Sequence, residues 1–212
     1  MTKHFTKRDL LAAEKAVNTD PKYGKEQDLI EQIIRMHPLN DDLYWIAIKV
    51  SLIDLTNSTQ LTNYKSKLSL YDISKIILDL QIDDKIKKGE IEVVQEIAKA
   101  CKNFDNGKGV NLFSFASKYC CYHNVFAYDR DDFSIFDNVV SQHLYEYATP
   151  LNPLRKTTPE EWRVKIDYKA YNDYIGKLLD EKGIHVNGRR RMFDHFVWNT
   201  YRPSNIDNKQ NK

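Results

Sequence analysis

Two titratable side chains in the middle of the sequence have the types and surroundings that covalent chemistry at an electrophilic carbon needs. Lys118 lies in the apolar and aromatic segment LFSFASKYCC, and Asp137 follows the short apolar run FSIF. Surroundings of low dielectric favour the neutral form of an amine, which can attack such a carbon and form a Schiff base. A nearby carboxylate can orient the amine, move protons or stabilise a developing positive charge. The pair therefore predicts a nucleophilic amine with a carboxylate partner.

Each of these residues also has an ordinary structural explanation. A lysine on a helix commonly packs its aliphatic stem against neighbours and keeps its ammonium group in water. Asp is a preferred N-cap, because its side-chain oxygen accepts a hydrogen bond from an amide of the first helical turn. A helical scaffold in which Lys118 and Asp137 are only structural therefore stays open as an alternative.

The segments that would position this pair follow the 3.6-residue period of helices along most of the chain. Capping residues and apolar spacing set the expected boundaries. The sequence DNGKG at 105–109 predicts a turn, and 124–134 is expected to be a loop. We expect helices at about 6–17, 25–36, 40–56, 69–80, 112–121, 137–147, 158–181 and 187–201, with a further short helix ending near Tyr64. Within 83–103, Gly89 is expected to separate a short turn from the main helix.

The composition fits one globular all-α domain. Of the 212 residues, 42% are hydrophobic and 29% charged, and only seven are Gly and six Pro, which disfavours a β-sandwich or barrel. The net charge of +2 neither requires nor excludes a nucleic-acid partner. Cys101, Cys120 and Cys121 are expected to be reduced thiols. No segment is typical of a membrane span or a secretory leader, so we expect a cytoplasmic protein without a membrane partner.

Three stretches upstream of Lys118 are similar, in order, to elements of the helix–hairpin–helix DNA glycosylase superfamily. LYWIAIKVSLIDLTNSTQL resembles the first core helix and the Thr/Asn-rich loop after it, KLSLYDISKIILDL the next helix, and KIKKGEIEVVQEIAKACKNF the helix before the hairpin. Members carry a Lys after the hairpin and then an Asp preceded by an apolar run, as Lys118 and Asp137 in SIFDNVV do. The similarity covers about 43–147, is one of order and spacing, and is greatest to the 8-oxoguanine glycosylase-like branch.

The resemblance implies a bilobal all-α fold over residues 1–204. A core lobe would span about 43–147, residues 1–42 and 148–204 would build a second lobe, and the tail 205–212 is expected to be disordered. Double-stranded DNA would lie in the cleft between the lobes with one damaged nucleotide flipped out.

The implied function is base-excision repair, as a monomer without a cofactor. Lys118 would attack the sugar C1′, release the damaged base and promote strand cleavage by β-elimination, while Asp137 assists. The protein would then be a DNA glycosylase with AP-lyase activity on damaged bases such as oxidised purines.

Further residues are candidates for contact with the DNA or for the walls of the base pocket. Arg189 and Arg190 open the last expected helix with two cations, and Trp198 on the same helix has the spacing of a core residue. The candidates for DNA contact are Asn57, Ser114, Ser117, Arg189 and Arg190, and those for the pocket are Tyr122, His123 and Tyr128.

The sequence departs from the family pattern at the hairpin. The family hairpin carries glycines whose backbone approaches a phosphate, whereas the corresponding stretch 112–117 has none, so the hydroxyls of Ser114 and Ser117 would have to substitute. A catalytically inactive module that binds nucleic acid or protein is therefore the alternative function. No cysteine follows Cys121, which excludes the iron–sulfur cluster of some members, and Cys120, Cys121 and His123 lack a fourth metal ligand.

Overall fold

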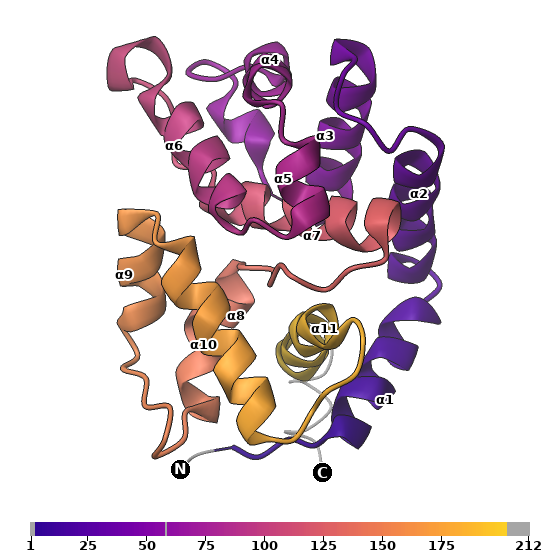
Figure 1. Cartoon of the computed structure of the whole chain (residues 1–212), viewed down its shortest axis with the longest axis vertical. Coiled ribbons are helices and arrows are strands. Elements are labelled where there is room, and N and C mark those ends of the chain that lie inside the picture. The colour runs from indigo at the N-terminus through magenta and orange to yellow at the C-terminus, as the bar shows by residue number, and fades with distance from the viewer. Residues whose placement is uncertain (1–2, 58, 203–212) are drawn as a thin grey trace.

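The computed structural model describes residues 3–57 and 59–202, and these residues form helices and loops with no β-strand. The prediction of an all-α chain is confirmed. Figure 1 shows the helices in two groups, one above the other, with α2 running along one side. No helix within the described ranges is both long and apolar enough to cross a membrane.

The upper group contains helices from the first two-thirds of the chain. α7 lies at the base of this group, where α2, α3, α5 and α6 pack against it. Every residue of α7 from Phe115 to Asn124 is buried, which explains why this helix is apolar on nearly all sides. The elements are α2 (Tyr23–Met36), α3 (Leu43–Asn57), the 3-10 helix η1 (Leu61–Tyr64), α4 (Leu70–Leu80), α5 (Asp83–Lys88), α6 (Glu92–Gly107) and α7 (Phe113–Tyr128).

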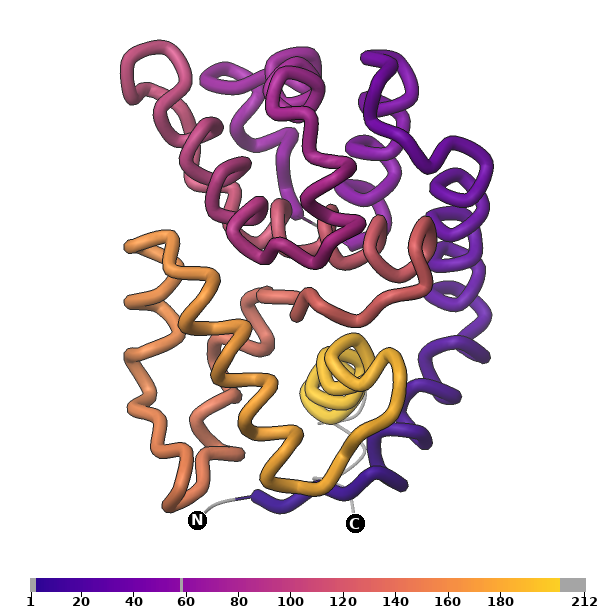
Figure 2. Tube along the Cα trace, in the orientation of Figure 1, coloured from indigo at the N-terminus to yellow at the C-terminus, as the bar shows by residue number. Residues whose placement is uncertain are grey.

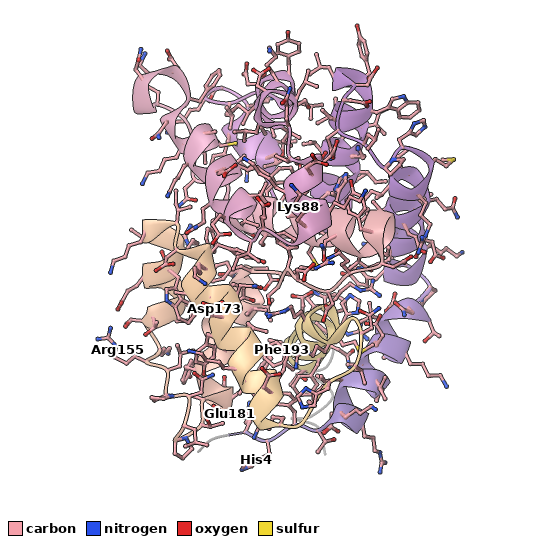
Figure 3. The ribbon with its side chains drawn as sticks, viewed as in Figure 1. His4, Lys88, Arg155, Asp173, Glu181 and Phe193 are labelled. Atoms are coloured by element: carbon pink, nitrogen blue, oxygen red, sulfur yellow. The ribbon has the colours of Figure 1, made fainter. Side chains whose placement is uncertain are left out.

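The lower group combines the first helix with those that follow α7. α11 packs along α1 and against α8 and α10. The ring of Phe193 on α11 lies 5.3 Å from that of Phe5 and 6.1 Å from that of Tyr147, inside the group, whereas Arg155 points outward (Figure 3). The elements are α1 (Lys7–Asn18), α8 (Asn138–His143), the 3-10 helix η2 (Leu144–Tyr147), α9 (Thr158–Lys165), α10 (Tyr168–Glu181) and α11 (Arg189–Tyr201).

The non-helical segment 129–137 crosses the middle of the molecule between the two groups (Figure 2). Its backbone is tied to α7 because the Ser117 hydroxyl accepts a hydrogen bond from the Phe136 amide at 3.0 Å. On the other side, the Tyr168 hydroxyl of α10 accepts from the Ser134 amide at 2.8 Å. These bonds hold Asp137, the next residue, between α7 and the lower group.

Two expected boundaries are wrong. α7 continues to Tyr128, so the connection expected at 124–134 begins only at Asp129, which closes the helix in a left-handed conformation. The helix expected over 158–181 is divided into α9 and α10 at Ile166, whose φ is 57°. No Gly or Pro marks this break in the sequence, and burial of Ile166, which is 3% exposed, offsets the backbone strain.

The predicted turn at 105–109 joins α6 to α7. The backbone leaves the helical conformation at Phe104. A Cβ on Gly109 would lie 1.9 Å from the Cys101 carbonyl oxygen, so only glycine fits this close approach. The stretch 112–117, which the sequence comparison assigns to the hairpin, is instead the start of α7. The turn between α6 and α7 thus contains Gly107 and Gly109, whereas the stretch 112–117 contains no glycine.

The expected lobe boundaries stay a prediction. That prediction assigns α8 and η2 to the core lobe. In the structure, α8 packs against α9 and α11 of the lower group. The tail 205–212 lies outside the described residues.

Candidate functional site

A pocket of about 550 Å³ opens between the two groups of helices, and both Lys118 and Asp137 line it. Its walls come from α2 and α3, from α7 and α8, and from α9 and α11. The pair that the sequence selected for chemistry is therefore brought to one cavity.

Lys118 reaches the pocket wall from the middle of α7. Its side chain is buried to all but 6% of its surface, and its Nζ donates a hydrogen bond of 3.3 Å to the Asn57 carbonyl at the end of α3. Lys118 and Asp137 do not form an ion pair within 4.0 Å. The amine thus faces the cavity without a neutralising carboxylate in contact.

Asp137 is fixed by its position as the N-cap of α8. Its Oδ1 accepts a hydrogen bond from the Val140 amide at 2.8 Å, as the sequence predicts. The preceding residues, Phe133 to Phe136, are all buried. The Asp137 carboxylate is thus held in place, because the Asp137 backbone cannot move without pulling the preceding apolar side chains from the core.

Asp194 of α11 is a third titratable group at the pocket, which the sequence analysis missed. It is 9% exposed, and its buried Oδ1 has no hydrogen-bond partner among the described residues. Burial raises its pKa well above the usual range, the Asp137 charge raises it further, and the Lys118 charge opposes this. Asp194 therefore retains its proton to higher pH than an exposed aspartate does. Its only sequence indication is a lone acid between the apolar residues of the last helix.

Aromatic rings form much of the remaining wall. Tyr122 follows Lys118 by one turn of α7, and Phe136 directly precedes Asp137. Trp198, which the sequence analysis assigns to the core, lines the pocket and packs edge-on against Tyr23 at 4.6 Å between ring centroids. Polar side chains make up most of the rest of the wall, so a planar heterocycle would meet both ring contacts and hydrogen-bonding groups there.

Three other predicted site residues also reach the pocket. Asn57, Ser114 and Tyr122 line it together with Lys118 and Asp137. The Tyr122 hydroxyl donates to the Asn57 Oδ1 at 2.7 Å.

Three predicted site residues lie elsewhere in the molecule. Ser117 is fully buried and bonds only within the protein, to the Ser114 and Phe136 backbone. His123 is fully buried in the upper group, where desolvation holds its pKa well below the usual range. Tyr128, at the end of α7, does not belong to the pocket wall. Helical periodicity alone does not distinguish a side chain that faces the core from one that faces a cavity.

Arg189 and Arg190 are occupied by partners inside the protein. Arg189 pairs with Asp180 at 2.5 Å and donates to a backbone carbonyl at 2.7 Å. Arg190 donates to the Ser134 hydroxyl at 2.9 Å and to the Asn172 carbonyl at 2.8 Å. Both guanidinium groups are thus engaged in fixing α11, and neither lines the pocket.

Metal-binding clusters and a second hollow were the other places in the described residues where a site could lie. No cluster of three or more His, Cys, Asp or Glu side chains there could hold a metal ion, and the three thiols are free and buried. A second hollow of about 640 Å³ lies between α2 and α3, but none of the side chains that line it is titratable near neutral pH.

Residues 8–131 match a protein family described as HI_0787_N, N-terminal domain, over more than half of the chain. The chain belongs to this family. The matched range of HI_0787_N runs through α7 and includes Lys118 and Tyr122, whereas Asp137 and α11 lie beyond it. The family match thus includes the pocket-lining residues of α2, α3 and α7, but not those of α8, α9 and α11.

An uncharacterised protein of Haemophilus influenzae is 28% identical to this chain over 127 residues. The aligned region covers 57% of this chain and 58% of that protein, so the chain spans less than two-thirds of the length of the curated relative it matches. No solved structure gives a significant match.

Proposed function

We propose that this protein is a DNA glycosylase with AP-lyase activity, in which Lys118 is the nucleophile and Asp137 its carboxylate partner. One observation carries the proposal: Lys118, 6% exposed, and the helix-capping Asp137 line the same pocket of about 550 Å³ without forming an ion pair. This volume lies in the range of pockets that enclose small organic groups, such as one extruded nucleobase.

The residues at the pocket suffice for the proposed steps. As the Lys118 nitrogen bonds to C1′, the bond from C1′ to the base breaks, and the base leaves with the electron pair and takes up a proton. Asp137 accepts the proton that the nitrogen loses. Opening of the sugar at O4′, with protonation of that oxygen, gives a Schiff base. Removal of a C2′ proton then expels the 3′ phosphate, and water hydrolyses the imine.

Asp194 and the aromatic walls support a base as the occupant of the pocket. A protonated carboxyl group with an unpartnered oxygen can both donate and accept hydrogen bonds at the edge of a heterocycle. The Trp198 ring at the pocket wall can stack on such a base. Oxidised purines, which carry both donors and acceptors, are the class we propose.

The finer features of the fold and partner belong to the same proposal. The two groups of helices would be the two lobes of the helix–hairpin–helix glycosylase type, with double-stranded DNA crossing the mouth of the pocket near Asn57 and Ser114. Reduced thiols suit a monomeric protein of the cytoplasm.

Borohydride trapping tests the nucleophile. The full chain is mixed with duplex DNA that holds 8-oxoguanine or an abasic site, and sodium borohydride reduces the Schiff base to a stable covalent adduct. Wild-type protein should give an adduct on a denaturing gel, and Lys118→Gln should give none. Lys85→Gln, which removes a half-buried lysine of the salt bridge to Glu96, is the matched control and should trap normally.

Asp137→Asn tests the carboxylate separately from the fold. Asn also caps helices well, so α8 and the melting temperature should be preserved. Adduct formation should slow by roughly 10²- to 10⁴-fold, the usual contribution of a positioned acid or base. An equal rate in Asp137→Asn, or no adduct with wild-type protein on either DNA, would refute the proposal.

A further inference from the structure

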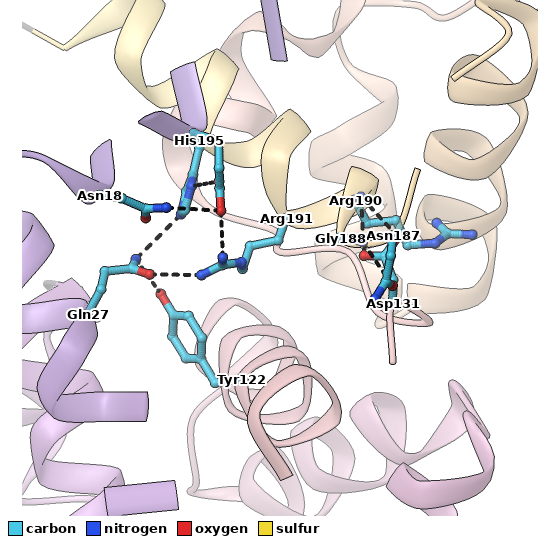
Figure 4. A network of polar contacts seen from close by, with 10 residues as sticks. Asn18, Gln27, Tyr122, Asp131, Asn187, Gly188, Arg190, Arg191 and His195 are labelled. Carbon is cyan, nitrogen blue, oxygen red and sulfur yellow. Dashed lines mark hydrogen bonds and ion pairs between the residues drawn. The ribbon is translucent and has the colours of Figure 1, made fainter. Parts of the chain in front are cut away.

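Four side chains beside the pocket close a ring of hydrogen bonds (Figure 4). Arg191 donates from one nitrogen to Glu14 at 2.5 Å and from the other to the Gln27 Oε1 at 3.1 Å. The Gln27 Nε2 lies 3.4 Å from the His195 Nε2, and the His195 Nδ1 contacts the second oxygen of Glu14. The ring joins α1, α2 and α11, which are far apart in the sequence.

Only one arrangement of protons satisfies every bond of this ring. A guanidinium group can only donate, so the Gln27 oxygen faces Arg191 and the Gln27 amide group faces His195. His195 must then accept at Nε2 and carry its proton on Nδ1, which donates to the Glu14 carboxylate. Gln27 also lies 3.5 Å from the Tyr122 hydroxyl, which donates to Asn57 and can therefore only accept from Gln27.

Both alternative states of the ring bring two donors together. If the Gln27 amide were flipped, its NH₂ group would face the Arg191 guanidinium. If His195 were protonated, its Nε2–H would face the Gln27 NH₂ group. Two charged groups face His195: Glu14 of α1, and Arg191, which lies on α11 together with His195. Burial lowers the pKa of His195, although the hydrogen bond to Glu14 opposes the shift.

Gln27 and His195 line the pocket, whereas Glu14 and Arg191 do not. We infer that Glu14 and Arg191 are positioning residues that commit the Gln27 amide to donate a hydrogen bond into the pocket. One of its two hydrogens is used by His195, and the other has only the long contact to Tyr122. An occupant with a keto oxygen at this place can take that hydrogen, whereas an exocyclic amino group there would meet a donor.

This inference deepens the proposed function and depends on a nucleobase being the occupant. It predicts that the pocket prefers bases with a keto group over their amino counterparts. Inosine and adenosine are suitable probes, because they differ chiefly in carrying an oxygen or an amino group at the same ring position.

The affinities of the two nucleosides are measured by NMR titration of the full-length protein. Wild-type protein should bind inosine more tightly than adenosine. In Glu14→Gln the ring cannot satisfy all its donors in either direction, so both orientations of Gln27 become populated. The ratio of the two dissociation constants should then fall by about 3- to 10-fold, the usual effect of one hydrogen bond.

Glu31→Gln is the matched control. Glu31 carries the same charge and pairs with Arg35 of α2, and it forms no hydrogen bond with any member of the ring. This variant should keep the wild-type ratio. If Glu14→Gln weakened the binding of inosine and adenosine equally, the role of Glu14 would be merely structural and the inference would be overturned. Failure of both nucleosides to bind to wild-type protein would also overturn it.

The His195 tautomer gives a second readout that needs neither DNA nor catalysis. Nitrogen-15 NMR of the wild-type imidazole should show a protonated Nδ1 and a bare Nε2, and Glu14→Gln should give a mixture of tautomers. A bare Nδ1 in wild-type protein would overturn the inference. Loss of borohydride trapping with a preserved nucleoside ratio and tautomer would instead refute only the lyase chemistry.

Discussion

Asp194 is a single carboxyl group whose burial ties stability to pH. In an unfolded chain its pKa is near 3.9. Burial raises the pKa of the folded state well above that value. Between the two values the folded chain binds more protons than the unfolded one, so stability falls as pH rises through this window. The pocket therefore keeps this acid at a cost to the fold.

Asp194→Asn should make the protein more stable while damaging its site. The amide preserves the shape of the side chain and cannot ionise, so the gain in stability over wild type should be small at pH 4 and grow as the pH rises toward 8. Calorimetric melting of both proteins at pH 4 and pH 8 measures it. A gain that is equal at the two pH values would contradict the role assigned to burial.

The predicted site residues that line the pocket come from neighbouring parts of one sequence pattern. Lys118 and Tyr122 lie one turn apart on α7, and Asp137 caps the next helix, so local order was enough to select them. Gln27 and His195 come from opposite ends of the chain. No local pattern marks them, because only the packing of α11 against α1 and α2 brings them to the site.

Among the elements, the reversal between α6 and α7 sets where Lys118 lies. The two helices pack directly against each other. Gly109 is the point of closest approach, and its amide donates to the Phe104 carbonyl at 3.0 Å. Any displacement here would move the start of α7 and, with it, the Lys118 amine in the pocket wall.

Gly109→Ala should destabilise the fold by about 3 kcal/mol, because its Cβ would overlap the Cys101 backbone, which cannot swing away. Gly183→Ala is the control: its φ of +64° strains an alanine, but nothing lies within 4 Å, so about 1 kcal/mol is expected. Urea unfolding measures both. Equal losses would show that the close approach is unimportant.

The break between α9 and α10 shows what sequence patterns leave out at this scale. Ile166 has a left-handed conformation that β-branched residues rarely adopt, and the sequence carries helix-favouring residues on both sides. The Asp167 side chain caps α10 through the Ala170 amide at 3.1 Å. A tertiary contact, the burial of Ile166, decides the break, and periodicity contains no information about it.

In the whole molecule, the two groups of helices share one continuous apolar core. We therefore expect a single cooperative unfolding transition. Trp45 on α3 stacks on His37 in the upper group, and Trp162 on α9 packs on Tyr174 in the lower group. Variants that keep only one of these tryptophans should unfold at the same urea concentration by fluorescence. Separate midpoints would mean two independent units.

The pocket wall extends along the chain from Val17 to Trp198. A nascent chain emerging from the ribosome would therefore display α7 and its lysine long before the wall that α11 supplies has been synthesised. Until then Glu14 would also lack both Arg191 and His195. Premature termination before the last helix thus yields copies without a finished cavity.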